Sequence, residues 1–164
     1  MNAEGPAEGR PRRSTAEYHR WAVSSVLDST PPRFSLDDAA RIAEDRFGVQ
    51  GTASALGSER DQAFLLEGGV LKISNPSEDE AVLDLEEAAI AHVAAVDPGL
   101  PVARPLAPRA TVDGHQVRMF ERRYGRNGGP ELDDSAVWEI AAMHARLCLA
   151  LRSFFHPAAG RELL

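Results

Sequence analysis

The segment GGVLKIS (residues 68–74) decides the fold, because it joins a tight turn to a strand and carries the only lysine of the chain. All other residues among the 18 Lys+Arg are arginines. The paired glycines predict a hairpin whose second strand is residues 70–74. Alternation along that strand puts Lys72 on the face opposite Leu71 and Ile73. A polar group therefore lies in the middle of an otherwise apolar strand.

Further helices and short strands flank this hairpin. We expect helices at residues 35–47, 77–96 and 135–154, and strands at residues 52–56, 63–67, 70–74, 102–106 and 115–121. Ser35 with Asp38, and Ser77 with Glu80, have the spacing of capping boxes. A turn at Asp113-Gly114 should join the last two strands. Tight turns make neighbouring strands antiparallel, so we predict an α+β fold with a five-stranded, mostly antiparallel sheet and helices packed on it.

Composition restricts the class of protein. The chain has 164 residues, 43% of them hydrophobic, and a net charge of −7, which disfavours nucleic acid or an anionic membrane as partner. No apolar run approaches the ~20 residues of a membrane span. The single cysteine, Cys148, lies among leucines, so we expect it to be a small buried apolar residue in a cytoplasmic protein.

Lys72 has two possible roles. It either extends to solvent from an edge strand or points into a polar pocket. Three features favour the pocket: acidic residues Glu86 and Glu87 on the following helix, a loop at residues 57–62 suited to phosphates, and a glycine-rich connector after Phe120. A strand lysine held by a helix glutamate under a phosphate-covering loop is typical of the nucleotide-binding half of a protein-kinase-like fold.

Three stretches together resemble the small lobe of the aminoglycoside phosphotransferase family, and within it the hydroxylysine-kinase-type branch. They are GSERDQAF (57–64), VLKISNPSED (70–79) and VLDLEEAA (82–89), and LPVARP (100–105), VRMF (117–120) and FFHPAAGRELL (154–164) continue the match. Similar lobes also occur at the front of fusions with a class III aminotransferase.

The resemblance implies that ATP is the cofactor, with Mg²⁺ in complete relatives. It makes Lys72 the phosphate-contacting residue and Glu86 the helix residue that orients it, with Glu87 as second choice. Ala63 stands where the family pattern has asparagine. The resemblance implies these further contacts: for the nucleotide loop Gly57, Ser58, Arg60, Asp61 and Gln62, and for the adenine edge the backbone near Phe120, Glu121 and Arg122.

The resemblance also divides the chain. It makes residues 34–122 the small lobe and residues 123–164 a hinge with the first helix of an incomplete large lobe. The composition of residues 1–33, rich in Gly, Pro, Ala, Arg and Ser, predicts a mostly disordered tail and linker before them. The catalytic aspartate and metal-binding motifs of the family have no counterpart here, so we expect no catalytic or metal-ligating residue and no kinase activity from this chain alone.

Three functions stay open at this stage. The chain could be the N-terminal nucleotide-binding part of an ATP-dependent small-molecule phosphotransferase. It could be a non-catalytic module that binds nucleotide or a partner, or a remnant of a larger phosphotransferase–aminotransferase fusion. The last helix carries an apolar stripe, which we expect to contact the missing lobe or a second copy of the chain.

Overall fold

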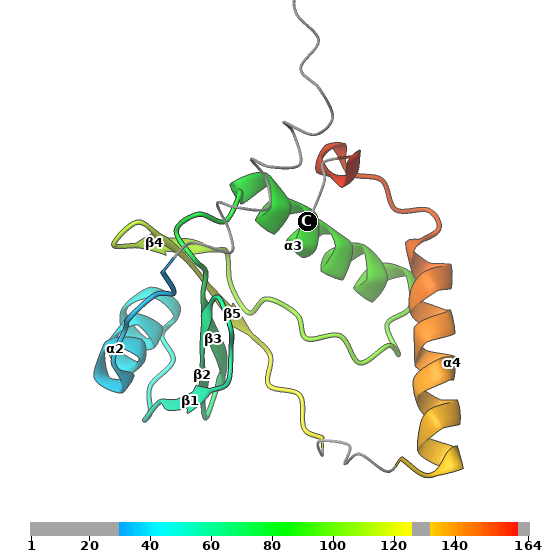
Figure 1. Ribbon diagram of the computed structural model, residues 1–164, viewed down its shortest axis with the longest axis horizontal. Helices are drawn as coiled ribbons and strands as arrows, with labels where there is room; N and C mark the ends of the chain where they lie inside the picture. Colours follow the sequence, from blue (N-terminus) through cyan, green and yellow to red (C-terminus); the bar gives the residue numbers. More distant parts are fainter. Residues whose placement is uncertain (1–29, 126–131, 161–164) are drawn as a thin grey trace, which may run out of the picture.

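The computed structural model describes residues 30–125 and 132–160, which form an α+β fold (Figure 1). The sheet has five strands in the order β1-β2-β3-β5-β4, and every neighbouring pair is antiparallel, as predicted. The strands are β1 (Ser54–Leu56), β2 (Gln62–Leu66), β3 (Gly69–Ile73), β4 (Ala110–Val112) and β5 (His115–Phe120). The helices are α2 (Leu36–Phe47), α3 (Glu80–Val96), α4 (Asp134–Leu151) and the short 3-10 helix η1 (Pro157–Gly160).

Helix α2 forms where its end signals predict it. Ser35 accepts a hydrogen bond from the backbone N–H of Asp38, and the Asp38 carboxylate accepts one from the backbone N–H of Ser35. This predicted capping box satisfies two N–H groups that have no partner inside the helix. Gly48 ends the helix with φ of 67°, a conformation that costs glycine little.

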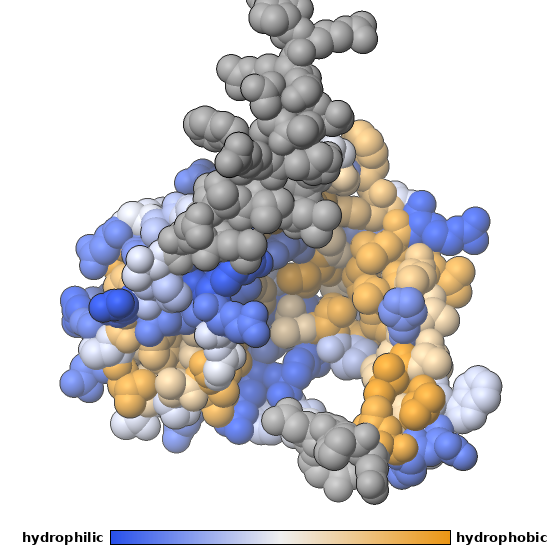
Figure 2. All heavy atoms as spheres, in the orientation of Figure 1, coloured by the Kyte–Doolittle hydropathy of each residue, from blue (hydrophilic) through white to orange (hydrophobic). Residues whose placement is uncertain are grey.

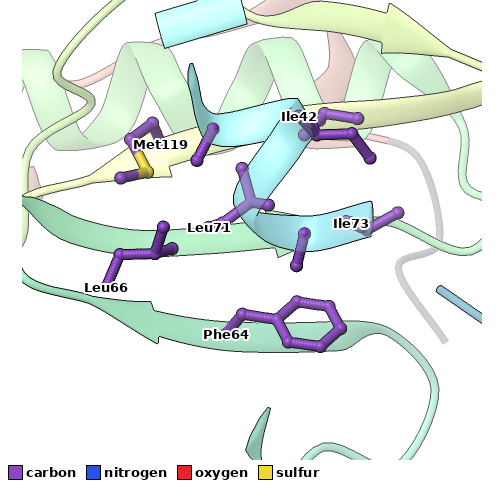
Figure 3. Packing of buried hydrophobic residues seen from close by; sticks show 9 residues of the cluster. Ile42, Phe64, Leu66, Leu71, Ile73 and Met119 are labelled. Carbon is purple, nitrogen blue, oxygen red and sulfur yellow. The ribbon is translucent and has the colours of Figure 1, made fainter. Parts of the chain in front are cut away.

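The apolar face of the sheet is covered by α2. Leu71 and Ile73 of β3 are fully buried there, beside neighbouring side chains of β2 and β5. Figure 3 shows Ile42 of α2 lying over this group. The buried members of this core are Ala39, Ile42, Ala43, Phe64, Leu66, Leu71, Ile73, Val117 and Met119. Its burial is the main favourable term that holds α2 to the sheet.

The opposite face of the sheet is polar at its centre. Lys72 lies between Ala63 of β2 and Arg118 of β5 in the strand register. Because neighbours in register point to the same side, Lys72 and Arg118 both face away from the core that contains Leu71. Arg118 contacts Glu86 of α3, so this is the face toward α3. Figure 1 accordingly shows α2 and α3 on opposite sides of the sheet.

Helix α4 contacts the rest of the protein mainly through its C-terminal half. Leu147, Ala150 and Leu151 belong to a small cluster with Val93 and Leu100 at the end of α3. Figure 2 shows hydrophobic side chains along α4, on the side of the molecule away from α2. The exposed large apolar residues of this helix are Val137, Trp138, Ile140, Met143 and Leu149.

The expectation that Cys148 is buried is wrong, because its side chain is exposed. The leucines beside it in the sequence do not surround it on a helix, where neighbours point in different directions. Only Leu147 and Leu151 turn toward the small cluster at the end of α3. An ion pair between Arg146 and Asp97, with Nη2 2.6 Å from Oδ1, adds to this contact.

One predicted strand is wrong. Residues 102–106 form no strand, and only Pro105 makes an isolated bridge, to Phe120. Proline has no N–H to donate to a ladder, which disfavours a regular strand here. The partner of β5 is instead β4, whose Thr111 and Val112 are β-branched. Both residues of the predicted turn, Asp113 and Gly114, have positive φ, as a tight hairpin requires.

The start of α3 also differs from the prediction. The helix begins at Glu80 with Asp79 as its N-cap, and Ser77 forms no capping box with Glu80. Ser77 donates its hydroxyl to Asn75 instead, at 2.7 Å. Asp79 and Asp133 cap α3 and α4, because their carboxylates accept hydrogen bonds from the backbone N–H groups of Ala81 and Ala136. Residues 1–29 of the expected tail and linker at residues 1–33, and residues 126–131 of the expected hinge region, lie outside the described residues.

Gly69 is the residue of the hairpin that the fold requires most. The turn itself uses Glu67 and Gly68, and Gly69 is already the first residue of β3. A Cβ added at Gly69 would collide with the backbone carbonyl oxygen of Phe120 on β5.

We therefore expect Gly69→Ala to lower the free energy of unfolding by about 1–3 kcal/mol, because β3 and β5 must move apart. Gly57→Ala is the matched control, since a Cβ there meets nothing within 4 Å, and it should change stability by less than about 0.5 kcal/mol. Urea titration followed by circular dichroism measures both. Equal stability of the two variants would contradict this account of the β3–β5 contact.

The capping box of α2 predicts a pH dependence. Hydrogen bonds from the Ser35 hydroxyl, the Ser35 backbone N–H and Arg41 together lower the pKa of Asp38 from 3.8 to about 2. A carboxylate whose pKa is lower in the folded state stabilises the fold above its unfolded pKa and stops doing so as pH falls through its folded pKa. The difference in melting temperature between wild type and Asp38→Asn should therefore be constant above about pH 5 and disappear between about pH 4 and 2. Asp37→Asn is the control, and a pH-independent difference for Asp38→Asn would contradict the prediction.

Candidate functional site

Lys72 is partly exposed on the polar face of the sheet. Its ammonium Nζ lies 2.9 Å from Oδ2 of Asp61, in the loop between β1 and β2, and its side chain keeps 35% of its surface accessible. The lysine therefore belongs neither to the apolar core nor fully to bulk solvent. Its charge is matched by a loop carboxylate instead of a helix carboxylate.

Asp61 is fixed by the segment that follows β3. Its Oδ1 accepts a hydrogen bond from the backbone N–H of Asn75 at 3.0 Å. Asn75 is itself buried, and its side chain donates to the carbonyl oxygen of Arg60 at 3.3 Å. Asn75 thus connects both ends of the hairpin around Lys72 and holds the Asp61 carboxylate in place.

The expected pair between Lys72 and Glu86 is not formed. Glu86 accepts a 2.7 Å hydrogen bond and ion pair from Nη1 of Arg118, the cross-strand neighbour of Lys72. Arg118 is only 2% exposed, and a guanidinium in such a position is costly unless a carboxylate neutralises it. Glu86 is therefore engaged with the more deeply buried of the two neighbouring cations, which is why the expected pair with Lys72 is not formed.

Arg118 has few other partners. Its guanidinium lies 5.4 Å from the centre of the Phe120 ring. Its Nη2 lies 3.5 Å from Oγ of Ser74, which is a long and therefore weak hydrogen bond. Its Nε has no hydrogen-bond partner among the described residues. The Glu86 carboxylate is thus its only described ionic partner, which makes this pair a strong constraint on where α3 lies.

The second choice for a lysine partner is also engaged elsewhere. Glu87 lies 3.3 Å from Nη1 of Arg109, and Asp84 lies 2.6 Å from Nη2 of the same guanidinium. Arg109 comes directly before β4, so these two contacts hold α3 to the edge of the sheet. Asp84, Glu86 and Glu87 of α3 therefore bind two arginines of the sheet region instead of Lys72.

The predicted nucleotide loop is brought beside Lys72, but two of its residues have structural partners. Asp61 forms the ion pair with Lys72. Gln62 exchanges hydrogen bonds with the backbone of Phe34, accepting at 2.7 Å and donating at 3.2 Å, and so ties β2 to the start of α2. Gly57, Ser58 and Arg60 are exposed and form the outer part of the loop.

The predicted adenine edge is partly engaged as well. The backbone N–H of Glu121 donates to the carbonyl oxygen of Arg104 at 2.8 Å, and the Glu121 carboxylate pairs with Arg123 at 2.7 Å. Phe120 packs against Arg118, and the exposed Arg122 lies 4.6 Å from the ring centre of Tyr124. The N–H group of Glu121 is therefore not free to meet a base.

The described residues add no group of metal-binding side chains to the surroundings of Lys72. Among the residues described, no three His, Cys, Asp or Glu side chains stand where they could hold a metal ion together. His115 bonds the carbonyl oxygen of Ser74, and His92 bonds that of Ala150, so both take part in packing contacts. His144 is exposed beside Cys148 on α4. Within the same residues, no helix combines the length and apolar character that crossing a membrane requires.

Comparisons with known proteins add no relative. No family model matches the chain, and neither a curated protein nor a solved structure matches it. The structure shows an α+β fold with a five-stranded antiparallel sheet, and the kinase-like interpretation is a prediction from the sequence motifs.

The structure gives two residues contacts that the sequence did not predict. No role was predicted for Arg118, although it lies between Val117 and Met119 and so puts a charge into the alternating pattern of β5, as Lys72 does in β3. Asp61 was expected to face a nucleotide and faces the lysine instead. Only the pairing of β3 with β5 reveals that the two cations are neighbours and must share the carboxylates nearby.

A double-mutant cycle tests which cation Glu86 serves. We expect a coupling free energy of about 0.5–1.5 kcal/mol between Glu86→Gln and Arg118→Met, because the two side chains form one ion pair. The coupling between Glu86→Gln and Lys72→Met should stay below about 0.5 kcal/mol. Chemical denaturation of the four proteins of each cycle measures both values. A larger coupling to Lys72 than to Arg118 would reverse the assignment.

Proposed function

We propose that this chain is the nucleotide-binding small lobe of an ATP-dependent small-molecule phosphotransferase, with a protein-kinase-like arrangement of strands. The observation that carries the proposal is the position of Lys72. It lies on β3, in the middle of the sheet order, on the face away from the α2 core, and its ammonium remains accessible. A cation in that position is suited to the negative charge of a nucleotide's phosphates.

The surroundings of Lys72 fit the phosphate part of a nucleotide. Arg118 lies beside it in register and adds positive charge on the same face, while Glu86 balances that charge from α3. The exposed loop residues Ser58 and Arg60 supply further donors within the same loop as Asp61. Bound ATP would supply the transferable phosphoryl group. Lys72 would hold its phosphates by a charge-assisted hydrogen bond.

The base would need a different contact from the one predicted. The Glu121 N–H is engaged with Arg104, so contacts to the phosphates would contribute most of the binding energy. In this proposal the chain binds the nucleotide and does not itself catalyse phosphoryl transfer. A cytoplasmic location, where ATP is available, belongs to the same proposal.

A second candidate function is a non-catalytic module that binds a protein partner. The specific observation in its favour is α4, on which Trp138 is 76% exposed and Leu149 is 62% exposed. Large apolar side chains gathered on one helix are typical of a surface that another protein surface covers. This partner would be a further lobe or a second copy of the chain, and the two candidate functions are compatible with each other.

Nucleotide binding tests the first proposal. Isothermal titration of the full chain with ATP should show saturable binding that Lys72→Ala weakens by about 10- to 100-fold, because a hydrogen bond to a charged group contributes about 1.5–3 kcal/mol. Adenosine, which has no phosphates, should bind wild type and variant equally. The control is Arg41→Ala, which removes an exposed cation of α2 that pairs with Asp38. ATP affinity that does not depend on Lys72 would contradict the proposal.

A further inference from the structure

The contact between Lys72 and Asp61 closes the candidate site with a group from the site's own loop. The Asp61 carboxylate lies 2.9 Å from the ammonium, in the place that a phosphate oxygen would take. Carboxylate and phosphate oxygens accept from the same N–H donors, and their negative charges repel each other when both lie beside one ammonium. A polyphosphate that reaches Lys72 therefore competes with Asp61.

We propose that Asp61 is an autoinhibitory residue: its carboxylate occupies Lys72 in the nucleotide-free protein, and an incoming nucleotide exchanges its phosphates for that carboxylate. The inference deepens the proposed function and rests on it. Asp61 is then the competitor of the nucleotide for Lys72, a role that neither the sequence motifs nor the family resemblance implies.

The carboxylate is built into its position. The backbone N–H of Asn75 donates to Oδ1 at 3.0 Å, which leaves Oδ2 directed at Lys72. Asn75 is 3% exposed, and its Oδ1 in turn accepts hydrogen bonds from the backbone N–H and hydroxyl of Ser77, at 3.0 and 2.7 Å. Asp61 is therefore held in place by a backbone group of the segment between β3 and α3, next to a buried side chain.

The same geometry makes the contact reversible. Asp61 has one strong partner besides Lys72, so its carboxylate can keep the Asn75 hydrogen bond while the ammonium turns to another anion. The lysine side chain is 35% exposed, which lets a solute reach it. Ion pairs with this degree of exposure contribute modestly and are weakened by salt. Displacement by a multiply charged polyphosphate is therefore feasible.

The alternative is that Asp61 only neutralises Lys72 and has no influence on binding. The arrangement of the neighbouring carboxylates argues against this role. Glu86 of α3 reaches the same face of the sheet, yet it pairs with Arg118, the cross-strand neighbour of Lys72. The lysine is thus paired with Asp61, a carboxylate of the predicted phosphate loop, where a change of partner changes the loop itself.

The variant Asp61→Asn tests the inference. It removes the charge and keeps an oxygen that can accept from the Asn75 N–H. ATP binding, measured by isothermal titration of the full chain, should become about three- to tenfold tighter than in wild type, because the competing ion pair is gone. Adenosine affinity should not change. The gain should disappear in the double variant Asp61→Asn/Lys72→Ala, since Lys72 is the group that is released.

The matched control is Asp84→Asn. It removes the same unit of charge from an ion pair with Arg109, and Asp84 makes no described contact with Lys72. A general increase in positive potential would tighten ATP binding in both variants to the same degree. We expect a change of less than about twofold for Asp84→Asn, because long-range charge effects are screened at physiological salt.

The outcomes separate this inference from the proposed function. ATP binding that depends on Lys72 but is unchanged or weakened by Asp61→Asn would overturn the autoinhibitory role and leave the nucleotide proposal intact. ATP binding that does not depend on Lys72, or no binding by any variant, would overturn both. Should Asp61→Asn fail to fold, as judged by circular dichroism, Asp61→Ser provides a shorter uncharged acceptor for the same titration, with the same expected gain.

Discussion

The structure depends on how two buried or half-buried cations on one face of the sheet are neutralised. Lys72 and Arg118 are cross-strand neighbours, and both point away from the apolar core under α2. Arg118 is the more buried, and an unpaired guanidinium there would be costly. Glu86 of α3 supplies its carboxylate and so fixes α3 against the sheet. Lys72 is left to the loop carboxylate of Asp61.

This division of charges explains the character of the candidate site. One cation is used to hold the helix, and the other keeps an accessible ammonium whose partner lies on a loop. In our proposal the first pair is structural and the second is functional. Asp84 and Glu87 of α3 pair with Arg109, so acidic residues in the N-terminal half of the helix attach it to the sheet. Removal of a nucleotide from Lys72 would therefore leave the position of α3 unchanged.

Much of the fold could be predicted from the sequence, because its signals are local. The Ser35–Asp38 capping box, the Asp113-Gly114 turn and the alternation through Lys72 all depend on residues a few positions apart. The predicted strand at residues 102–106 is wrong. The segment contains apolar residues that suit a strand, but Pro105 has no N–H to donate and so prevents a regular ladder. The exposure of Cys148 was missed because it depends on how much of α4 has a surface to pack on.

The candidate site was predicted only in part, for a different reason. Sequence placed Lys72, Asp61 and the acidic residues of α3 in the same region, but not the partner of each charge. That choice depends on strand pairing, which puts Arg118 of β5 beside Lys72 of β3 although 46 positions separate them. The deeper cation then binds the helix carboxylate first, since its desolvation is the greater cost. No pattern within β3 or α3 alone contains this information.

The central claim is that the ammonium of Lys72 leaves Asp61 for the phosphates of a nucleotide. Because the chain has one lysine, selective ¹³C,¹⁵N-lysine labelling gives an NMR spectrum in which the side-chain signals belong to Lys72 alone. The account predicts that these signals shift saturably as ATP is added and stay in place with adenosine. Signals that respond to neither ligand, or to both equally, would contradict it.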